Sequence, residues 1–168
     1  MVKSFLTTIL AMFCFLLFET AVVSNLTFLP AVPDFLLIIT IFVSLNNGAL
    51  LAESTGFVSG FLLDFMSAAP FGFNALLRTI LGFVIGLFHD VLNASSIILQ
   101  FLYGAVATIL KAIVVYFISF FFNGVVPYSI FSQIFLTELL LNAFFTPILF
   151  QFLALFSEFI IVKPESNL

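Results

Sequence analysis

Long apolar runs with few charged interruptions are the feature that most limits what this chain can fold into. Hydrophobic residues make up 64% of its 168 residues and charged residues 7%, against roughly 45–50% and 25% in ordinary soluble domains. About 20 consecutive apolar residues in a helix cross the hydrocarbon core of a bilayer. The sequence therefore predicts an all-α integral membrane protein, with one multi-pass domain over residues 1–168.

Six apolar runs predict a bundle of six transmembrane helices. Their expected bounds are residues 5–23, 33–46, 49–67, 71–88, 97–122 and 128–162. The second run is short, since roughly 15 helical residues rise only about 22 Å, so this helix either thins the bilayer or enters without crossing. The last run is too long for one straight crossing, and Pro147 within it predicts a kink or a strong tilt.

The ends of the chain bear on its orientation. The first run has a competing interpretation as a cleaved signal peptide, with a weak cleavage site at Val22-Val23-Ser24. We favour a transmembrane helix, because the sequence that follows is itself membrane-embedded. Lys3 and Lys163 lie just outside the first and last runs. Six crossings would place both lysines on the cytoplasmic side, as the positive-inside rule predicts.

Two stripes of small and polar residues follow the third and fourth expected helices at a spacing of four. They are Ala52, Gly56, Gly60, Asp64 and Ala68, and Asn74, Arg78, Gly82, Gly86 and Asp90. In a bilayer, small residues mark the faces on which helices approach closely. We therefore expect the two helices to pack tightly, with Gly56 and Gly60 inside the domain. Part of the Gly82 and Gly86 face is expected to receive an incoming transmembrane helix.

Ionisable residues within the apolar runs are expected to find partners, because an unpaired charge is costly inside a membrane. Lys111 and Glu138 lie at matching depths in the fifth and sixth helices, and we expect them to pair. Asp64 and Arg78 have the same opportunity at the outer ends of the third and fourth helices. We favour ion pairs that fix helix register over the alternative of proton or ion transport.

The sequence offers little for catalysis, metal binding or nucleic-acid binding. Cys14 is the one cysteine and His89 the one histidine, too few for the four ligands of a structural zinc site. No nucleophile and base occur at a usable spacing, and the four Lys and Arg residues form no basic patch. We therefore expect no enzyme, no cofactor, no metal and no nucleic-acid partner. His89 is interpreted as a solvated loop residue.

Three motifs carry a resemblance to a known family. They are Pro33-Asp34 opening the second helix, Gly56-Phe57-Val58-Ser59-Gly60 followed by Leu62-Leu63-Asp64, and Pro70-Phe71-Gly72-Phe73-Asn74-Ala75-Leu76 opening the fourth. In their order and separation, mainly over residues 33–86, the chain resembles the MreD family of bacterial rod-shape proteins.

The resemblance implies a non-catalytic, multi-pass protein of the bacterial cytoplasmic (inner) membrane, working among membrane lipid in the cell-elongation machinery. It implies binding to an MreC-like single-pass protein, and indirectly to MreB, RodA and the transpeptidase of RodA, in support of side-wall peptidoglycan synthesis. The implied fold is similar to substrate-binding subunits of energy-coupling transporters.

That likeness supplies the alternative function, a membrane subunit that binds a small solute. Such a subunit needs a polar pocket near the outer surface and a small-xxx-small face for its transporter partner. The first helix offers no clear face of this kind, since Ala11 is followed only by Phe15 at the required spacing.

Overall fold

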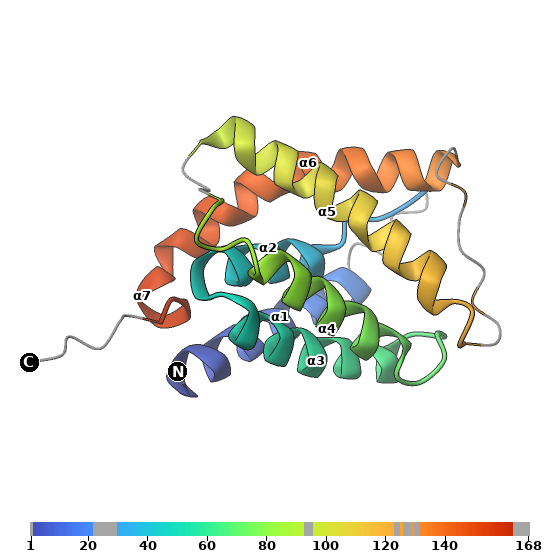
Figure 1. Ribbon diagram of the computed structural model, residues 1–168, viewed down its shortest axis with the longest axis horizontal. Helices are drawn as coiled ribbons and strands as arrows, with labels where there is room; N and C mark the ends of the chain where they lie inside the picture. Colours follow the sequence, from blue (N-terminus) through green and yellow to red (C-terminus); the bar gives the residue numbers. More distant parts are fainter. Residues whose placement is uncertain are drawn as a thin grey trace, which may run out of the picture.

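The computed structural model describes residues 2–21, 30–92, 96–122, 125, 129 and 132–162. Over these residues the chain is all-helical, as the sequence predicts. The helices are α1 (Val2–Ala21), α2 (Phe35–Asn47), α3 (Ala49–Met66), α4 (Phe73–Gly86), α5 (Ile97–Ile118), α6 (Gln133–Leu155) and α7 (Ser157–Ile160) (Figure 1). Four of them, α1, α3, α5 and α6, are long and apolar enough to cross a membrane.

Two of the six expected transmembrane helices are shorter than a full crossing. α2 has 13 residues and α4 has 14, so they rise about 20 Å and about 21 Å, less than the roughly 30 Å of the hydrocarbon core. Local backbone signals set their ends. Gly48 ends α2 with a positive φ of 78°, and Gly72 precedes α4 with a φ of 88°, which is a conformation that glycine adopts without strain.

The last expected helix, residues 128–162, is two helices. α6 ends at Leu155, and Phe156 leaves the helical conformation before α7 begins. Pro147 lies inside α6, and the α6 ribbon bends along its length in Figure 1. The expected helix ends at residues 23 and 128, the Val22-Val23-Ser24 site and Lys163 lie outside the described residues.

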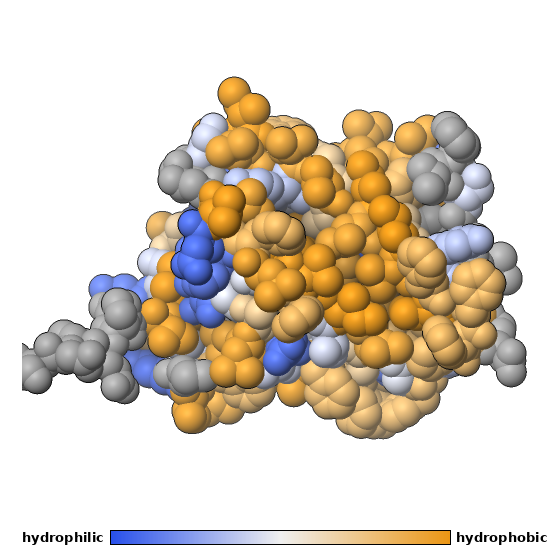
Figure 2. Space-filling view, viewed as in Figure 1, coloured by the Kyte–Doolittle hydropathy of each residue, from blue (hydrophilic) through white to orange (hydrophobic). Residues whose placement is uncertain are grey.

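α2 is the centre of the molecule. Every residue from Phe35 to Leu45 is buried, and α2 packs against α1, α3, α4, α5 and α6. A helix that is apolar all round is expected to be buried on all sides. The other helices each bury one side against this core and expose large apolar side chains on the other, such as Leu6, Phe65 and Phe117. Figure 2 shows a surface that is mostly hydrophobic on the face in view. This outer surface suits contact with lipid.

α3 and α4 form a tight antiparallel hairpin in which all four predicted glycines are used. A methyl group on Gly56 would lie 2.6 Å from the carbonyl oxygen of Arg78, and one on Gly60 would overlap the backbone of Asn74. The close approach predicted for these helices is confirmed.

The expectation that part of the Gly82 and Gly86 face stays open for another helix is wrong. A methyl group on Gly82 would lie 2.6 Å from the carbonyl oxygen of Ala52, and one on Gly86 would lie 2.5 Å from the Cα of Ala49. All four glycines of the two stripes therefore lie in the α3–α4 contact, and none of them is open to another helix.

Candidate functional site

Asp34 begins α2 and is the centre of a buried polar network. Pro33 precedes it, and the Asp34 carboxylate caps the helix by accepting from the backbone N–H of Leu37 at 2.8 Å. The positive end of the helix dipole favours a carboxylate at this position. Asp34 is only 6% exposed, so a compensating cation is required.

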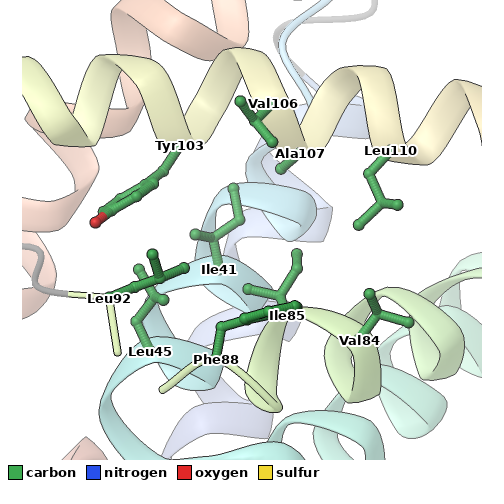
Figure 3. A pocket seen from close by; sticks show the side chains of 10 residues that line it. All are labelled: Ile41, Leu45, Val84, Ile85, Phe88, Leu92, Tyr103, Val106, Ala107 and Leu110. Carbon is green, nitrogen blue, oxygen red and sulfur yellow. The ribbon is translucent and has the colours of Figure 1, made fainter. Parts of the chain in front are cut away.

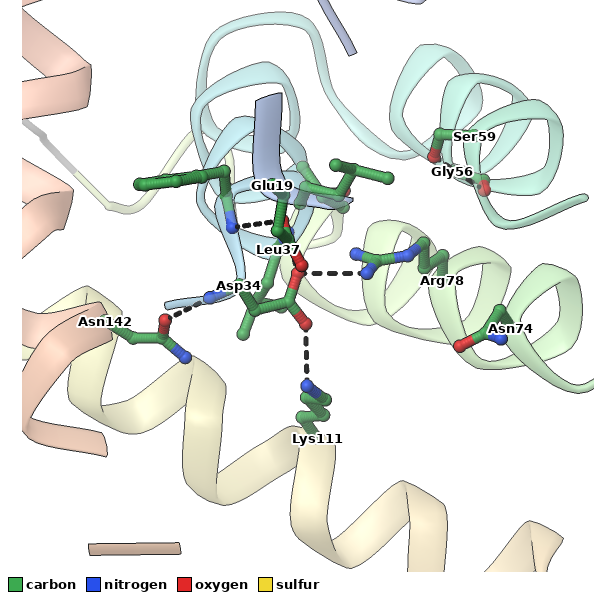
Figure 4. A network of polar contacts seen from close by, with 12 residues as sticks. Glu19, Asp34, Leu37, Gly56, Ser59, Asn74, Arg78, Lys111 and Asn142 are labelled. Carbon is green, nitrogen blue, oxygen red and sulfur yellow. Dashed lines mark hydrogen bonds and ion pairs between the residues drawn. The ribbon is translucent and has the colours of Figure 1, made fainter. Parts of the chain in front are cut away.

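Two cations from different helices meet this carboxylate (Figure 4). Arg78 of α4 donates from Nη2 to Asp34 Oδ1 at 2.9 Å, and Lys111 of α5 donates from Nζ to Oδ2 at 2.7 Å. Because both cations lie within their helices rather than at the helix ends, Asp34 starts α2 inside the bundle. One carboxylate thus fixes the register of three helices.

α6 joins the network through the predicted partner of Lys111. Lys111 Nζ donates to Glu138 Oε1 at 2.6 Å, so the expected Lys111–Glu138 pair is confirmed. One turn further along α6, Asn142 Oδ1 accepts from the backbone N–H of Asp34 at 2.7 Å, and its Nδ2 donates to Thr108 Oγ1 at 3.0 Å. The polar stripe of α6 therefore faces the start of α2.

The predicted pair of Asp64 with Arg78 is wrong, because each residue has a different partner. Asp64 accepts from the backbone N–H groups of Gly72, Asn74 and Ala75 at 3.0, 2.9 and 3.2 Å, and from the Asn74 side-chain amide at 2.9 Å. These donors are the free N–H groups at the start of α4. Asp64 therefore caps α4, and the Arg78 guanidinium is left to reach Asp34.

Glu19 is a member of the site that was not predicted from the sequence. It lies near the end of α1, and its Oε2 accepts from the backbone N–H of Phe35 at 3.2 Å. Its position within an apolar run is the signal that would have identified it. His89, interpreted as a loop residue, is part-exposed with its Nε2 3.1 Å from Asp90 Oδ1.

A cavity of about 410 Å³ adjoins the network. Its charged and polar lining residues are Glu19, Asp34, Asn74, Arg78, Lys111 and Glu138. The rest of the lining is apolar, from residues such as Leu77, Val115 and Ile134. The cavity therefore brings together residues of α1, α3, α4, α5 and α6 at the N-cap of α2.

A second hollow is an apolar groove between α4 and α5, with a volume of about 260 Å³ (Figure 3). Ile41 and Leu45 of α2 contribute to its lining, and Ala107 and Val106 line it from α5. Val84 and Ile85 line it from α4, and neither belongs to the glycines that contact α3.

The network consists mainly of buried ion pairs between carboxylates and the side chains of Arg78 and Lys111. Among the described residues, no group of three His, Cys, Asp or Glu side chains could hold a metal ion. Removing one partner of a buried ion pair is far more costly than replacing both, so these pairs specify how the helices assemble.

A family model described as rod shape-determining protein MreD matches residues 2–159. The chain belongs to the MreD family. The match extends far beyond residues 33–86, which contain the three motifs, and reaches from α1 into α7. No curated protein and no solved structure matches the chain, so the likeness to transporter subunits remains a prediction. With four apolar helices long enough to cross a bilayer, the chain is an MreD-family membrane protein.

Proposed function

We propose that this chain is a non-catalytic component of the bacterial cell-elongation machinery, resident in the cytoplasmic membrane, that supports side-wall peptidoglycan synthesis. The observation that carries the proposal is the MreD family match over residues 2–159. A bundle held in register by buried ion pairs suits a scaffold, since its parts are fixed relative to one another. In this arrangement α2 and α4 serve as two short passages beside the four longer helices, with both termini in the cytoplasm.

The partner in this proposal is an MreC-like single-pass protein, through which the chain reaches MreB, RodA and the transpeptidase. The Gly82 and Gly86 face is closed by α3, so the incoming helix needs another surface. The apolar groove between α4 and α5 is the best candidate, because it is hollow and has the small residue Ala107 in its lining. Helices associate in lipid mainly through close packing of this kind.

A matched pair of variants on α5 tests the partner surface. Val106 lines the groove and is 52% exposed, whereas Ile109 on the same helix is 41% exposed and lies outside it. Val106→Phe should reduce co-purification of the MreC-like protein from membranes at least tenfold, because the larger side chain fills the groove. Ile109→Phe should leave capture unchanged, and both variants should keep the unfolding midpoint of the parent.

Cell shape supplies the functional readout. In a rod-shaped host that lacks its own MreD, the parent chain and Ile109→Phe should restore rods, and Val106→Phe should leave rounded cells. Full capture and rod shape with Val106→Phe would remove the groove from the proposal. Failure of the parent chain to capture an MreC-like protein from its own source would overturn the proposed function.

A further inference from the structure

The charged cavity is not used by the proposed scaffold function. Its volume of about 410 Å³ falls within the roughly 300–1,000 Å³ of pockets that hold small molecules. Its lining combines the charged groups with apolar side chains such as Leu77, Val115 and Ile134. Mixed walls of this kind are typical of sites that orient a small molecule through a few polar groups.

Arg78, which lines this cavity, has a hydrogen-bond donor without an acceptor in the described part of the chain. The side chain is 4% exposed, and its Nη2 donates to Asp34. Its Nε is buried and has no hydrogen-bond partner among the described residues. A buried N–H without an acceptor is unfavourable, so an occupant of the cavity should bring an oxygen that accepts from this atom.

Glu19 is a cavity carboxyl group that lacks a cationic partner among the described residues. The cavity is lined by three carboxyl side chains and two cationic side chains. Asp34 and Glu138 are both paired with Lys111, whereas Glu19 accepts from the backbone N–H of Phe35 and forms no ion pair within the described part of the chain. An occupant that brings a positive group to Glu19 would supply the cation that this carboxyl group lacks among the described residues.

We propose that this cavity binds a small zwitterion, with its ammonium group on Glu19 and its anionic oxygen group accepting from Arg78 Nε. An anion alone would leave Glu19 without a cation, and a cation alone would leave the Arg78 donor without an acceptor. Two sources share this chemistry, a free α-amino acid and the phosphoethanolamine headgroup of a membrane lipid. The apolar lining residues would contact the hydrocarbon part of either one.

Titration of the purified full-length chain in detergent micelles tests the proposal. The probes are glycine and phosphoethanolamine as zwitterions, with ethanolamine and inorganic phosphate as the separate halves. At least one zwitterion should raise the thermal unfolding midpoint by several degrees in a saturable way, because a ligand that binds only the folded state stabilises it. The separate halves should have no effect.

The two zwitterions also identify the source. A response to glycine alone assigns a free amino acid, and a response to phosphoethanolamine alone assigns a lipid headgroup. Both outcomes support the site. A midpoint unchanged by either zwitterion, as for a cavity that holds water only, would overturn it, and so would an equal response to ethanolamine or phosphate alone.

Two variants tie the response to the cavity. Glu19→Gln keeps an oxygen that accepts from Phe35 N–H but removes the charge, and it should weaken zwitterion binding at least tenfold. Glu53→Gln on α3, outside the cavity lining, should bind as the parent does. Parent-like binding by Glu19→Gln would overturn the proposal.

A steric pair keeps the test decisive if Glu19→Gln fails to fold. Ile134 lines the cavity at 49% exposure, and Ile148 on the same helix is 48% exposed and lies outside the lining. Ile134→Phe should abolish the zwitterion response without altering any charge, and Ile148→Phe should retain it. Equal responses from the two variants would place binding elsewhere. A loss of zwitterion binding that leaves capture of the MreC-like protein intact separates this site from the proposed function.

Discussion

Asp34 shows how a single carboxylate can organise a membrane bundle. It caps α2, pairs with Arg78 of α4 and Lys111 of α5, and offers its backbone N–H to Asn142 of α6. A buried ion pair often adds little net stability compared with apolar residues of the same size. The contribution of these ion pairs is specificity. They make one alignment of α2, α4, α5 and α6 more stable than alignments in which a helix is shifted along its axis.

Replacing Lys111 should expose this dependence. Lys111→Met removes the cation that Asp34 and Glu138 share, so we expect a loss of about 3–5 kcal/mol in the free energy of unfolding. Adding Glu138→Leu should recover part of the loss, because Asp34 retains Arg78. The measurement is denaturant unfolding in mixed micelles, with Ile113→Met at an exposed position of α5 as the control. A double variant that loses the sum of the two single effects would show that the residues do not interact.

The polar network also shows which residue contacts can be predicted from sequence. The Lys111–Glu138 pair was predictable, because depth along a helix follows from counting residues to its ends. The Arg78–Asp34 pair was not, since the direction of a side chain around a bundle depends on which helices become neighbours. Asp64 was the expected partner of Arg78 across a short turn. Its carboxylate instead accepts from the free N–H groups at the start of α4.

At the scale of elements, the α3–α4 hairpin depends on backbone contact at its glycines. Ala at Gly82 would bring a methyl group to 2.6 Å from the carbonyl of Ala52, a contact that neither backbone can relieve without separating the helices. Gly72 differs, because a methyl group added there would meet nothing within 4 Å and only its positive φ opposes substitution.

Alanine substitutions at these glycines should therefore distinguish the cost of overpacking between helices from the cost of a strained backbone conformation. Gly82→Ala and Gly60→Ala are expected to lower the free energy of unfolding by about 1–3 kcal/mol or more through overpacking. Gly72→Ala should cost about 1–2 kcal/mol through its left-handed conformation and should leave the α3–α4 spacing unchanged. Crosslinking between cysteines introduced on the outer faces of α3 and α4 reports that spacing. Parent-like spacing in Gly82→Ala would contradict this account.

The second prediction for the hairpin concerns the contribution of Asp64 to its stability. Its carboxylate satisfies three backbone N–H groups at the start of α4, so Asp64→Ala should cost about 0.5–2 kcal/mol as the loss of a helix cap. Asp90 has a side chain that is 85% exposed, and Asp90→Ala should stay within about 0.5 kcal/mol of the parent. Equal unfolding midpoints for the two variants would show that the cap contributes nothing.

On the scale of the whole molecule, the beginning and the end of the described chain meet at one side. α1 packs against α7, the Lys3 ammonium lies 5.0 Å from the ring centroid of Phe159, and Asn47 Oδ1 accepts from the backbone N–H of Val162 at 2.7 Å. Figure 1 shows the start of α1 and α7 on the same side of the bundle. An even number of passages is the simplest path that returns the chain there.

Topology reporters test this arrangement. Fusions at residue 1 and at residue 168 should give the same answer, and that answer should be cytoplasmic because Lys3 and Lys163 flank the first and last apolar runs. The control is a fusion in the α3–α4 turn after Ser67, which should report the opposite side. Terminal reporters on opposite sides would require an odd number of crossings, with α2 entering the membrane but not crossing it.

The overall architecture was largely predictable, because apolar runs and turn residues determine where membrane helices begin and end. All six expected runs contain a helix at the expected place. The division of the last run at Phe156 and the closure of the Gly82 and Gly86 face were not predictable, since both depend on tertiary contacts. The polar cavity likewise exists only because residues far apart in sequence, from Glu19 to Glu138, meet at the start of α2.

The central position of α2 has a consequence for how the protein is made. Thirteen residues that rise about 20 Å are a poor signal for stable insertion on their own, and the start of the helix carries Asp34 into the bundle. Its surroundings, which are α4, α5 and α6 together with α1 and α3, are mostly synthesised after it. We therefore expect α2 to reach its final place by assembly with helices already in the bilayer rather than at the moment of translocation, with the cations of α4 and α5 pairing with Asp34 in that step.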